Sequence, residues 1–314
     1  MPGSGDNNKI RTIFMGTPEF SLPGLASLSA APNFEIVGIF TQPDKPFGRK
    51  QVLTPPPVKE FALKHDLKIF QPQKIKLEVE TIKNLQPDLI VVIAYGKIIP
   101  PEILSIPKYT CINVHASLLP RYRGAACLNA PILNGDSETG VTIMQMEAGL
   151  DTGPILRQGI IKLTGTETLE IVHDKLSALG AELLVPTLND FIAGKITPQI
   201  QDDSQASYIK TLKKEDGKID WTKPAPEIER MVRAYNPWPG TYTTNNNKII
   251  KLISVEHEIL KSNDHKIGES FLANGRLAIQ CGQDSLVILR LQLEGKKIMT
   301  SEEFLRGHKI GPFV

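Results

Sequence analysis

The chain has 314 residues, of which 41% are hydrophobic and 22% are charged, and its formal net charge is +2. This composition is typical of a globular protein that can bury a sizeable core. No apolar stretch approaches the ~20 residues of a membrane span, and residues 1–8 are polar, unlike a secretion signal. We therefore expect a cytoplasmic protein that has no membrane partner. We also expect it to act as a monomer.

The three cysteines, Cys111, Cys127 and Cys281, form no CxxC pair and have no histidine cluster beside them. This spacing supports neither a zinc site nor a disulfide framework, so we expect reduced, mostly buried thiols and no bound metal.

Apolar, β-branched runs alternate with helical patterns through the first half of the chain, which is typical of a parallel α/β sheet. Strands are predicted at residues 10–15, 34–41, 88–95, 111–115 and 140–146. Helices are predicted at residues 56–66, 78–85 and 166–193. The last of these helices is expected to close the first domain.

The pattern changes after residue 194. Residues 195–207 are polar and lack periodicity, which favours a linker. Short strand-like runs follow at 249–259, 268–281 and 285–293, with one helix at 226–235. They predict a small β-barrel or sandwich of roughly 100 residues. We therefore expect domains at 1–194 and 212–314, joined by a linker at 195–211.

The charge is unevenly distributed. Residues 205–314 carry 17 Lys and Arg against 13 Asp and Glu, whereas residues 1–204 carry 19 against 21. A basic bias of this size is compatible with a nucleic-acid partner and equally with ordinary surface chemistry.

The first predicted strand is followed by Gly16, but the next residues, Thr-Pro-Glu-Phe, lack the later glycines of a GxGxxG dinucleotide motif. Without those glycines the backbone cannot approach a pyrophosphate closely, so dinucleotide binding is disfavoured.

An amide and an imidazole lie two residues apart near the end of a predicted strand, at Asn113 and His115. Side chains alternate along a strand, so both should point to the same face and could meet one substrate atom. Asp151 follows in a Gly- and Pro-containing loop that could aim its carboxylate into a cleft. The alternative is that the amide and the imidazole only cap a strand end.

These three residues suit the transfer of a chemical group between two bound substrates, in which a nucleophile of one substrate attacks a carbonyl carbon of the other. Ser117 is nearby but does not lie in the GxSxG turn that activates a serine, which disfavours covalent catalysis. Asn113 could donate to the oxyanion of a tetrahedral intermediate, and His115 can donate or accept a proton near neutral pH. Asp151 could orient the imidazole or collect a proton.

Several motifs in the same order carry a family resemblance. Residues 113–124 read Asn-Val-His-Ala-Ser-Leu-Leu-Pro-Arg-Tyr-Arg-Gly, and Gly-Val-Thr and Asp-Thr-Gly-Pro-Ile follow at 140–142 and 151–155. Further matching segments are 14–20, 41–46, 48–50, 55–59, 214–221 and 236–240. From about residue 9 onward, the chain closely resembles the 10-formyltetrahydrofolate-dependent formyltransferases.

The resemblance implies an α/β, Rossmann-like formyltransferase domain with a mostly parallel sheet, followed by an OB-like β-barrel. It also implies transfer of the formyl group of 10-formyltetrahydrofolate to the α-amino group of initiator methionyl-tRNA. By position, it assigns catalysis to Asn113, His115 and Asp151. It assigns folate binding to two loops, formed by Ser117, Leu118, Leu119 and Pro120 and by Tyr95, Gly96, Lys97 and Ile98.

The loop at residues 42–57 is longer than most connections between a strand and a helix, and such loops are usually functional or disordered. Its cations Lys45, Arg49 and Lys50 could contact an RNA acceptor end, and the resemblance favours this over a solvated surface loop. In the barrel, the candidates for tRNA phosphate contacts are Lys213, Lys214, Lys248 and Lys251.

Two other functions remain open at this stage. A formyltransferase that acts on an amino sugar nucleotide would share the three catalytic residues and a similar barrel. A noncatalytic RNA-binding protein would use the barrel alone and would leave Asn113, His115 and Asp151 without a role.

Overall fold

The computed structural model describes residues 9–48, 51–245, 248–308 and 313. The chain forms two compact units that exchange segments. The first unit comprises Met1–Gly124, Thr139–Ile161 and His173–Ile209, and the second comprises Ala125–Glu138, Lys162–Val172 and Lys210–Val314. Each predicted domain, 1–194 and 212–314, is one continuous stretch of the chain, whereas each of these units is made of three separate segments. The predicted division stays a prediction.

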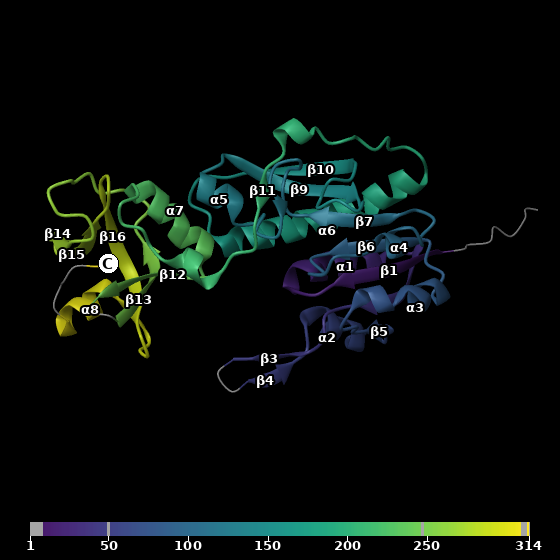
Figure 1. Ribbon diagram of the computed structural model, residues 1–314, viewed down its shortest axis with the longest axis horizontal. Coiled ribbons are helices and arrows are strands. Elements are labelled where there is room, and N and C mark those ends of the chain that lie inside the picture. The colour runs from purple at the N-terminus through teal and green to yellow at the C-terminus, as the bar shows by residue number, and fades with distance from the viewer. Residues whose placement is uncertain (1–8, 49–50, 246–247, 309–312, 314) are drawn as a thin grey trace, which may run out of the picture. The chain divides into compact units, whose positions relative to one another are not determined.

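The first unit is built on a seven-stranded sheet, counted over the described residues, in the order β10-β9-β7-β6-β1-β2-β5 (Figure 1). These strands are β1 (Ile10–Gly16), β2 (Phe34–Phe40), β5 (Ile69–Phe70), β6 (Leu89–Ile93), β7 (Cys111–His115), β9 (Glu138–Gln145) and β10 (Ile155–Lys162). The strands from β7 to β5 pair in parallel, and β9 pairs antiparallel with β7. All five residues of β6 are buried apolar residues, as expected for a parallel strand covered on both faces.

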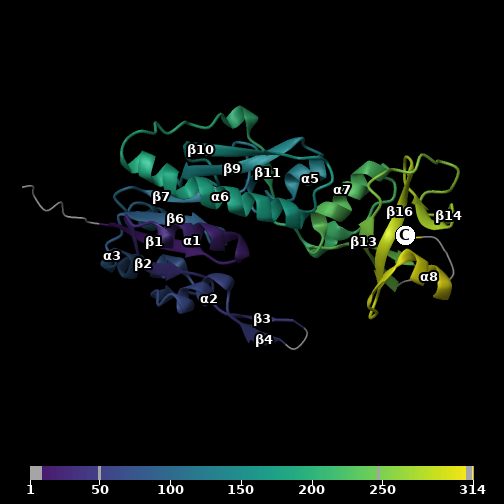
Figure 2. The same cartoon turned by 180° about the vertical axis from the view of Figure 1, so that it is seen from behind.

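Helices cover both faces of this sheet (Figures 1 and 2). They are α1 (Leu22–Ala30), α2 (Pro57–Lys64), α3 (Val79–Asn84), α4 (Pro101–Leu104) and α6 (Leu169–Ile192). Gly180 of α6 approaches Val114 of β7, and a Cβ at Gly180 would lie 3.0 Å from that side chain. On the other face, Ile82 of α3 and Ile103 of α4 join a core cluster with Cys111.

The second unit is β-rich. Its described strands follow the order β12-β13-β16-β15-β14, with β17 beside β16, and each pairing is antiparallel. The strands are β12 (Thr241–Asn245), β13 (Lys248–Val255), β14 (Ser270–Ala273), β15 (Arg276–Gln280), β16 (Ser285–Leu293) and β17 (Ile298–Thr300). Its helices are α5 (Ala130–Asn134), α7 (Ala225–Tyr235) and α8 (Ser301–Gly307). Ile228 and Val232, one turn apart on α7, join Leu286 in its core.

The predicted fold class, a mostly parallel α/β sheet followed by a β-rich unit, is therefore confirmed. The structure also separates elements that the sequence patterns merged. The single run predicted at 268–281 is a hairpin of β14 and β15, which turns at Asn274 and Gly275 with positive φ angles of 51° and 78°. Among the described helices, none is both long and apolar enough to cross a membrane.

Two segments predicted as loop or linker contain regular structure. The loop at 42–57 contains an antiparallel hairpin of β3 (Lys45–Phe47) and β4 (Val52–Thr54). The predicted linker contributes β11 (Tyr208–Ile209), which pairs in parallel with β8 (Arg123–Gly124). Gln199 also exchanges two backbone hydrogen bonds with Ile155, of 2.7 and 2.8 Å, so this segment is packed along the first unit.

Candidate active site

The carboxyl end of β7 carries two of the predicted catalytic residues. Val92 of β6 pairs with Asn113, and His115 is the last residue of the strand. Because Val114 faces α6, strand alternation turns Asn113 and His115 toward the opposite face of the sheet. Asn113 is half-buried and His115 is buried, so both lie at the edge of the core.

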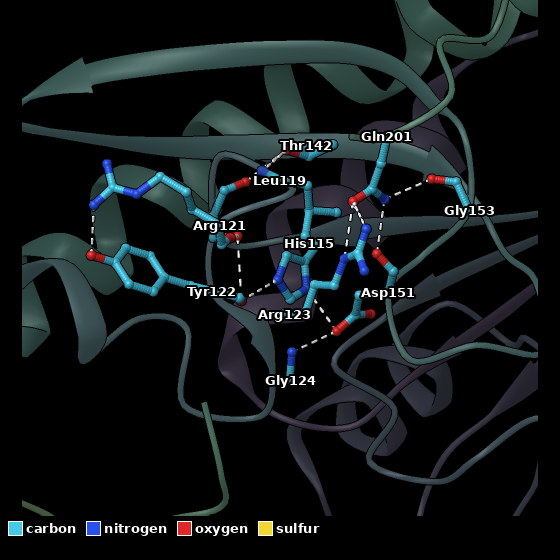
Figure 3. Close-up of polar contacts among 11 residues, drawn as sticks. His115, Leu119, Arg121, Tyr122, Arg123, Gly124, Thr142, Asp151, Gly153 and Gln201 are labelled. Carbon is cyan, nitrogen blue, oxygen red and sulfur yellow. Dashed lines mark hydrogen bonds and ion pairs between the residues drawn. The ribbon is translucent and has the colours of Figure 1, made fainter. Parts of the chain in front are cut away.

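Both ring nitrogens of His115 have defined neighbours (Figure 3). Its Nε2 lies 3.0 Å from the carbonyl oxygen of Tyr122. A carbonyl oxygen only accepts hydrogen bonds, so Nε2 must carry a proton. Its Nδ1 lies 3.7 Å from Oδ2 of Asp151, beyond the range of a direct hydrogen bond. Nδ1 is therefore the ring nitrogen left for a substrate.

The loop after β9 brings Asp151 to this strand end. Its Oδ2 accepts a 2.8 Å hydrogen bond from the backbone N–H of Gly124, which fixes the direction of the carboxylate. Asp151 itself has a φ of 54°, a left-handed conformation that aspartate tolerates better than most residues. The structure thus brings two sequence-distant residues, His115 and Asp151, to one place.

Only glycine fits at position 124. Its φ is 105°, and a Cβ there would lie 2.5 Å from the carbonyl oxygen of Ile209 in β11. The close approach of β11 therefore requires Gly124, whose N–H in turn holds Asp151.

A buried hydroxyl holds the predicted folate loop at residues 117–120. Thr142 accepts a 3.1 Å hydrogen bond from the N–H of Leu119 and donates a 2.7 Å bond to the carbonyl of Ser117. Gln158 donates 2.9 Å bonds to both Thr142 and the carbonyl of Leu119. The Gly-Val-Thr motif signalled Thr142 without giving it a role, and no motif signalled Gln158.

The second predicted folate loop, residues 95–98, presents mainly backbone and one apolar side chain. The ring of Tyr95 is 1% exposed, and burial raises the pKa of its hydroxyl to about 12. Its carbonyl accepts hydrogen bonds from Thr17 and Gln42, while Lys97 donates to carbonyls of the neighbouring 72–73 segment. Ile98, by contrast, is 89% exposed. A ligand could therefore meet Ile98 and the backbone here, but not the ring of Tyr95.

The predicted tRNA-contacting lysines are exposed wherever the structure describes them, at Lys45, Lys213, Lys214, Lys248 and Lys251. Arg49 and Lys50 lie outside the described residues. Within the described part of the chain, no group of three or more His, Cys, Asp or Glu side chains gathers as a metal site would require.

The second unit contains a cavity of about 340 Å³ that none of the predicted site residues lines. Glu229, in its wall, is 3% exposed and accepts hydrogen bonds from Arg233, with His257 3.1 Å away. Arg233 donates to both carboxylate oxygens of Glu229, so this buried carboxylate already has a partner and is not left for a ligand.

Two family models match the chain. One, described as formyl transferase, matches residues 9–188, and the other, described as formyl transferase, C-terminal domain, matches residues 211–309. The chain belongs to the formyl transferase family. This formyl transferase is accordingly an enzyme, which removes the noncatalytic alternative.

Curated relatives agree with this assignment. This formyl transferase is 48% identical to the methionyl-tRNA formyltransferase of Citrifermentans bemidjiense over 96% of its own length and 95% of the relative's. It is 47% identical to the Geobacter sulfurreducens protein of the same name, again over 96% and 95% of the two chains.

Among solved structures, an N-formyltransferase from Helicobacter canadensis, in complex with folinic acid and dTDP-3-aminofucose, aligns with a TM-score of 0.65 at 18% identity. That alignment covers 89% of this chain and 98% of the other. HypX from Aquifex aeolicus, in complex with tetrahydrofolic acid, aligns with a TM-score of 0.62 at 17% identity, covering 97% and 50%. At such identities the likeness shows the fold alone.

Proposed function

We propose that this formyl transferase moves the formyl group of 10-formyltetrahydrofolate to the α-amino group of initiator methionyl-tRNA. The observation that carries the proposal is the 48% identity to a methionyl-tRNA formyltransferase along 96% of the chain, which spans both family matches. The amino sugar nucleotide alternative has support only from structural neighbours near 18% identity, whose likeness concerns the fold.

Asn113, His115 and Asp151 are the proposed catalytic residues. The lone pair of the α-amino nitrogen attacks the formyl carbon, and the carbonyl oxygen becomes an oxyanion. The amide N–H of Asn113 and the Nδ1–H of a protonated His115 donate to that oxyanion. When the intermediate collapses, the bond from the formyl carbon to the folate nitrogen breaks and the new C–N bond remains.

The proposed role of Asp151 is to accept protons from the attacking amine. An α-ammonium group has no lone pair with which to attack, so its proton must leave first, and a carboxylate can accept it directly or through a water. The 3.7 Å between Nδ1 of His115 and Oδ2 of Asp151 keeps the two groups adjacent without a direct hydrogen bond. This first proton passes on to solvent. After the attack the nitrogen still carries a proton too many, and Asp151 collects that second proton and returns it to the leaving folate nitrogen, so that one proton is released overall.

The surroundings of β6 and β7 suit a flat, partly apolar folate. The two strands are parallel neighbours, so the 95–98 and 117–120 loops both lie at their carboxyl ends, where ligands of open α/β sheets gather. The exposed side chain of Ile98 offers an apolar contact, and the backbone groups of both loops can hydrogen-bond to a heterocycle. The proposed contacts to tRNA phosphates are made by exposed lysines, namely Lys45, Lys213, Lys214, Lys248 and Lys251.

Formyl transfer from 10-formyltetrahydrofolate tests the proposal directly. The acceptors to compare are charged initiator methionyl-tRNA and an amino sugar nucleotide, each with the wild type and with Asp151→Ala. We expect formylation of the tRNA only, and its loss in the variant. Product on the sugar alone would overturn the proposed acceptor while retaining the chemistry.

A further inference from the structure

Gln201 holds the loop that carries Asp151, although it lies in the segment that sequence patterns assign to a linker. Its side-chain Nε2 donates hydrogen bonds of 2.8 and 2.7 Å to the carbonyls of Asp151 and Gly153 (Figure 3). The antiparallel contact between Ile155 and Gln199 sets this register, because it places Gln201 beside Gly153. One amide thus ties down the loop on both sides of Thr152.

Arg123 fixes the orientation of that amide. Its guanidinium is 1% exposed and donates from Nε and Nη2 to Oε1 of Gln201, at 3.1 and 2.8 Å. Arginine only donates and backbone carbonyls only accept, so the Gln201 amide fits between them in one orientation. A flipped amide would point its NH₂ at the guanidinium and its oxygen at two carbonyl oxygens.

The buried charge of Arg123 has its own partners. Nη2 lies 2.7 Å from the carboxylate of Asp203, whose side chain is 81% exposed, and Nη1 donates to the hydroxyl of Tyr208 at 2.8 Å. Burial acts to lower the pKa of Arg123, but the hydrogen bonds to Asp203 and Tyr208 outweigh it, and the pKa lies above its usual value. A permanent cation in this position costs desolvation free energy, which its partners offset.

The segment that contains Gln201, residues 199–209, also holds the backbone that contacts His115. The N–H groups of Tyr122 and Arg123 donate to the side-chain and backbone oxygens of Ser207, at 2.9 and 2.8 Å. The carbonyl of Tyr122 then accepts from His115, and the N–H of Gly124 donates to Asp151. Residues 199–209 therefore support both members of the His115–Asp151 pair through separate contacts.

We propose that Arg123 and Gln201 are positioning residues for formyl transfer, which hold Asp151 at its working distance from His115. The proposal rests on the proposed function, because it assumes that Asp151 acts in the reaction. Neither residue touches substrate in this scheme. They act by keeping Asp151 in its left-handed conformation, with a φ of 54°, which few non-glycine residues adopt without support.

The first test is Gln201→Met, which keeps the volume of the side chain but removes both donors and the acceptor. We expect kcat to fall by about 10- to 100-fold, the size of effect that a misplacement of about 1 Å can cause. The KM values for folate and tRNA should stay near those of the wild type.

The matched control is Gln205→Met in the same segment, because Gln205 is exposed and its side chain donates to Asp202 rather than to the Asp151 loop. This control should keep full activity.

A double-mutant cycle separates positioning from a general structural defect. If Gln201 acts through Asp151, then Gln201→Met should cost little further activity in an Asp151→Asn background. An equal loss on both backgrounds, or a rise in KM with unchanged kcat, would overturn the inference. Failure of the proposed function would look different from failure of this inference, because the wild-type enzyme would then not formylate tRNA at all.

Gln201→Glu keeps the inference testable if the methionine variant does not fold. A glutamate retains the acceptor for Arg123 but turns an oxygen toward the carbonyls of Asp151 and Gly153. We expect a folded protein with the same loss of kcat and the same coupling to Asp151→Asn. A folded Gln201→Glu enzyme with wild-type kcat would overturn the proposal.

Discussion

At the scale of single residues, the backbone around His115 determines which ring nitrogen is available. Nε2 is occupied by the carbonyl of Tyr122, a residue with a φ of 60°, and Nδ1 faces Asp151. This arrangement does not depend on the substrate, because main-chain groups create it. The chemistry proposed for His115 is therefore assigned to Nδ1.

His115→Ala should lower kcat for formyl transfer by about 100-fold or more, because it removes a donor that acts on the developing oxyanion. Affinity for tRNA, measured by filter binding, should remain nearly intact. A large loss of tRNA affinity with a modest change in kcat would assign His115 to substrate binding instead.

Cys111 gives a prediction on stability and pH. Burial in the core raises the pKa of its thiol from 9.0 to about 12. Below pH 9 both states hold the proton, whereas between pH 9 and 12 only the unfolded state releases it. The free energy of unfolding should therefore fall as pH rises through this window, by about 1.4 kcal/mol per unit at most.

Urea unfolding of the wild type and Cys111→Ala at pH 8, 9 and 10 isolates this effect. The stability difference between the two proteins should change with pH above 9, because only the wild type carries the Cys111 thiol, whereas the buried Cys127 and Cys281 are common to both. Parallel pH profiles would show that Cys111 does not contribute in this way.

At the scale of elements, the β3–β4 hairpin has a fixed base and exposed apolar residues. Asp44, just before β3, accepts hydrogen bonds from Gln71 and Lys59, and these lower the pKa of its carboxyl. Val52 and Leu53 of β4 are 59% and 64% exposed. Adjacent exposed apolar residues on an anchored hairpin are consistent with contact to a partner.

Replacing Arg49 and Lys50 with alanine should raise KM for tRNA and reduce the slope of its salt dependence by about two, because each substitution removes one cation that pairs with a phosphate. KM for folate should not change. The control is Lys76→Ala with Lys83→Ala, which removes two exposed charges elsewhere in the first unit. Unchanged tRNA kinetics in the variant at residues 49 and 50 would remove these two cations from the proposed interface.

At the scale of the whole molecule, the two compact units are discontinuous in sequence. Helix α5 precedes the last strands of the first unit along the chain, yet it packs on α7. Asn129, just before α5, donates a buried 2.7 Å hydrogen bond to the carbonyl of Ala234, and Arg230 donates to the carbonyl of Leu133. A cut after β11 would therefore remove the packing partner of α5.

A fragment ending at Ile209 should unfold at a lower temperature than the full chain, because the apolar side chains of α5 become exposed, at a cost of about 1–3 kcal/mol for each large one. Thermal circular dichroism and binding of an apolar dye measure this. Ile132→Ser should destabilise the full chain, where Ile132 is 3% exposed, but hardly affect the fragment. Equal melting of fragment and full chain would contradict the expectation.

Local patterns in the sequence determined the fold class and the main strands and helices, although not the short hairpin of β3 and β4 or the strand β11. The period of two along β7 was enough to predict that Asn113 and His115 share a face, and β-branched composition was enough to locate β6. The helices α6 and α7 followed from their apolar spacing, within three residues at each end. These properties depend on neighbouring residues, so they are readable without a structure.

Tertiary structure alone decided what supports the candidate site. Gln201 reaches Asp151 across 50 positions and Arg123 across 78, and such contacts have no local signature. Tyr95 lies at the end of a strand as predicted, yet its ring turns into the core, because burial depends on which helices cover the sheet. A residue's type and spacing indicate what chemistry it could perform, whereas the position of its side chain depends on segments folded against it from elsewhere in the chain.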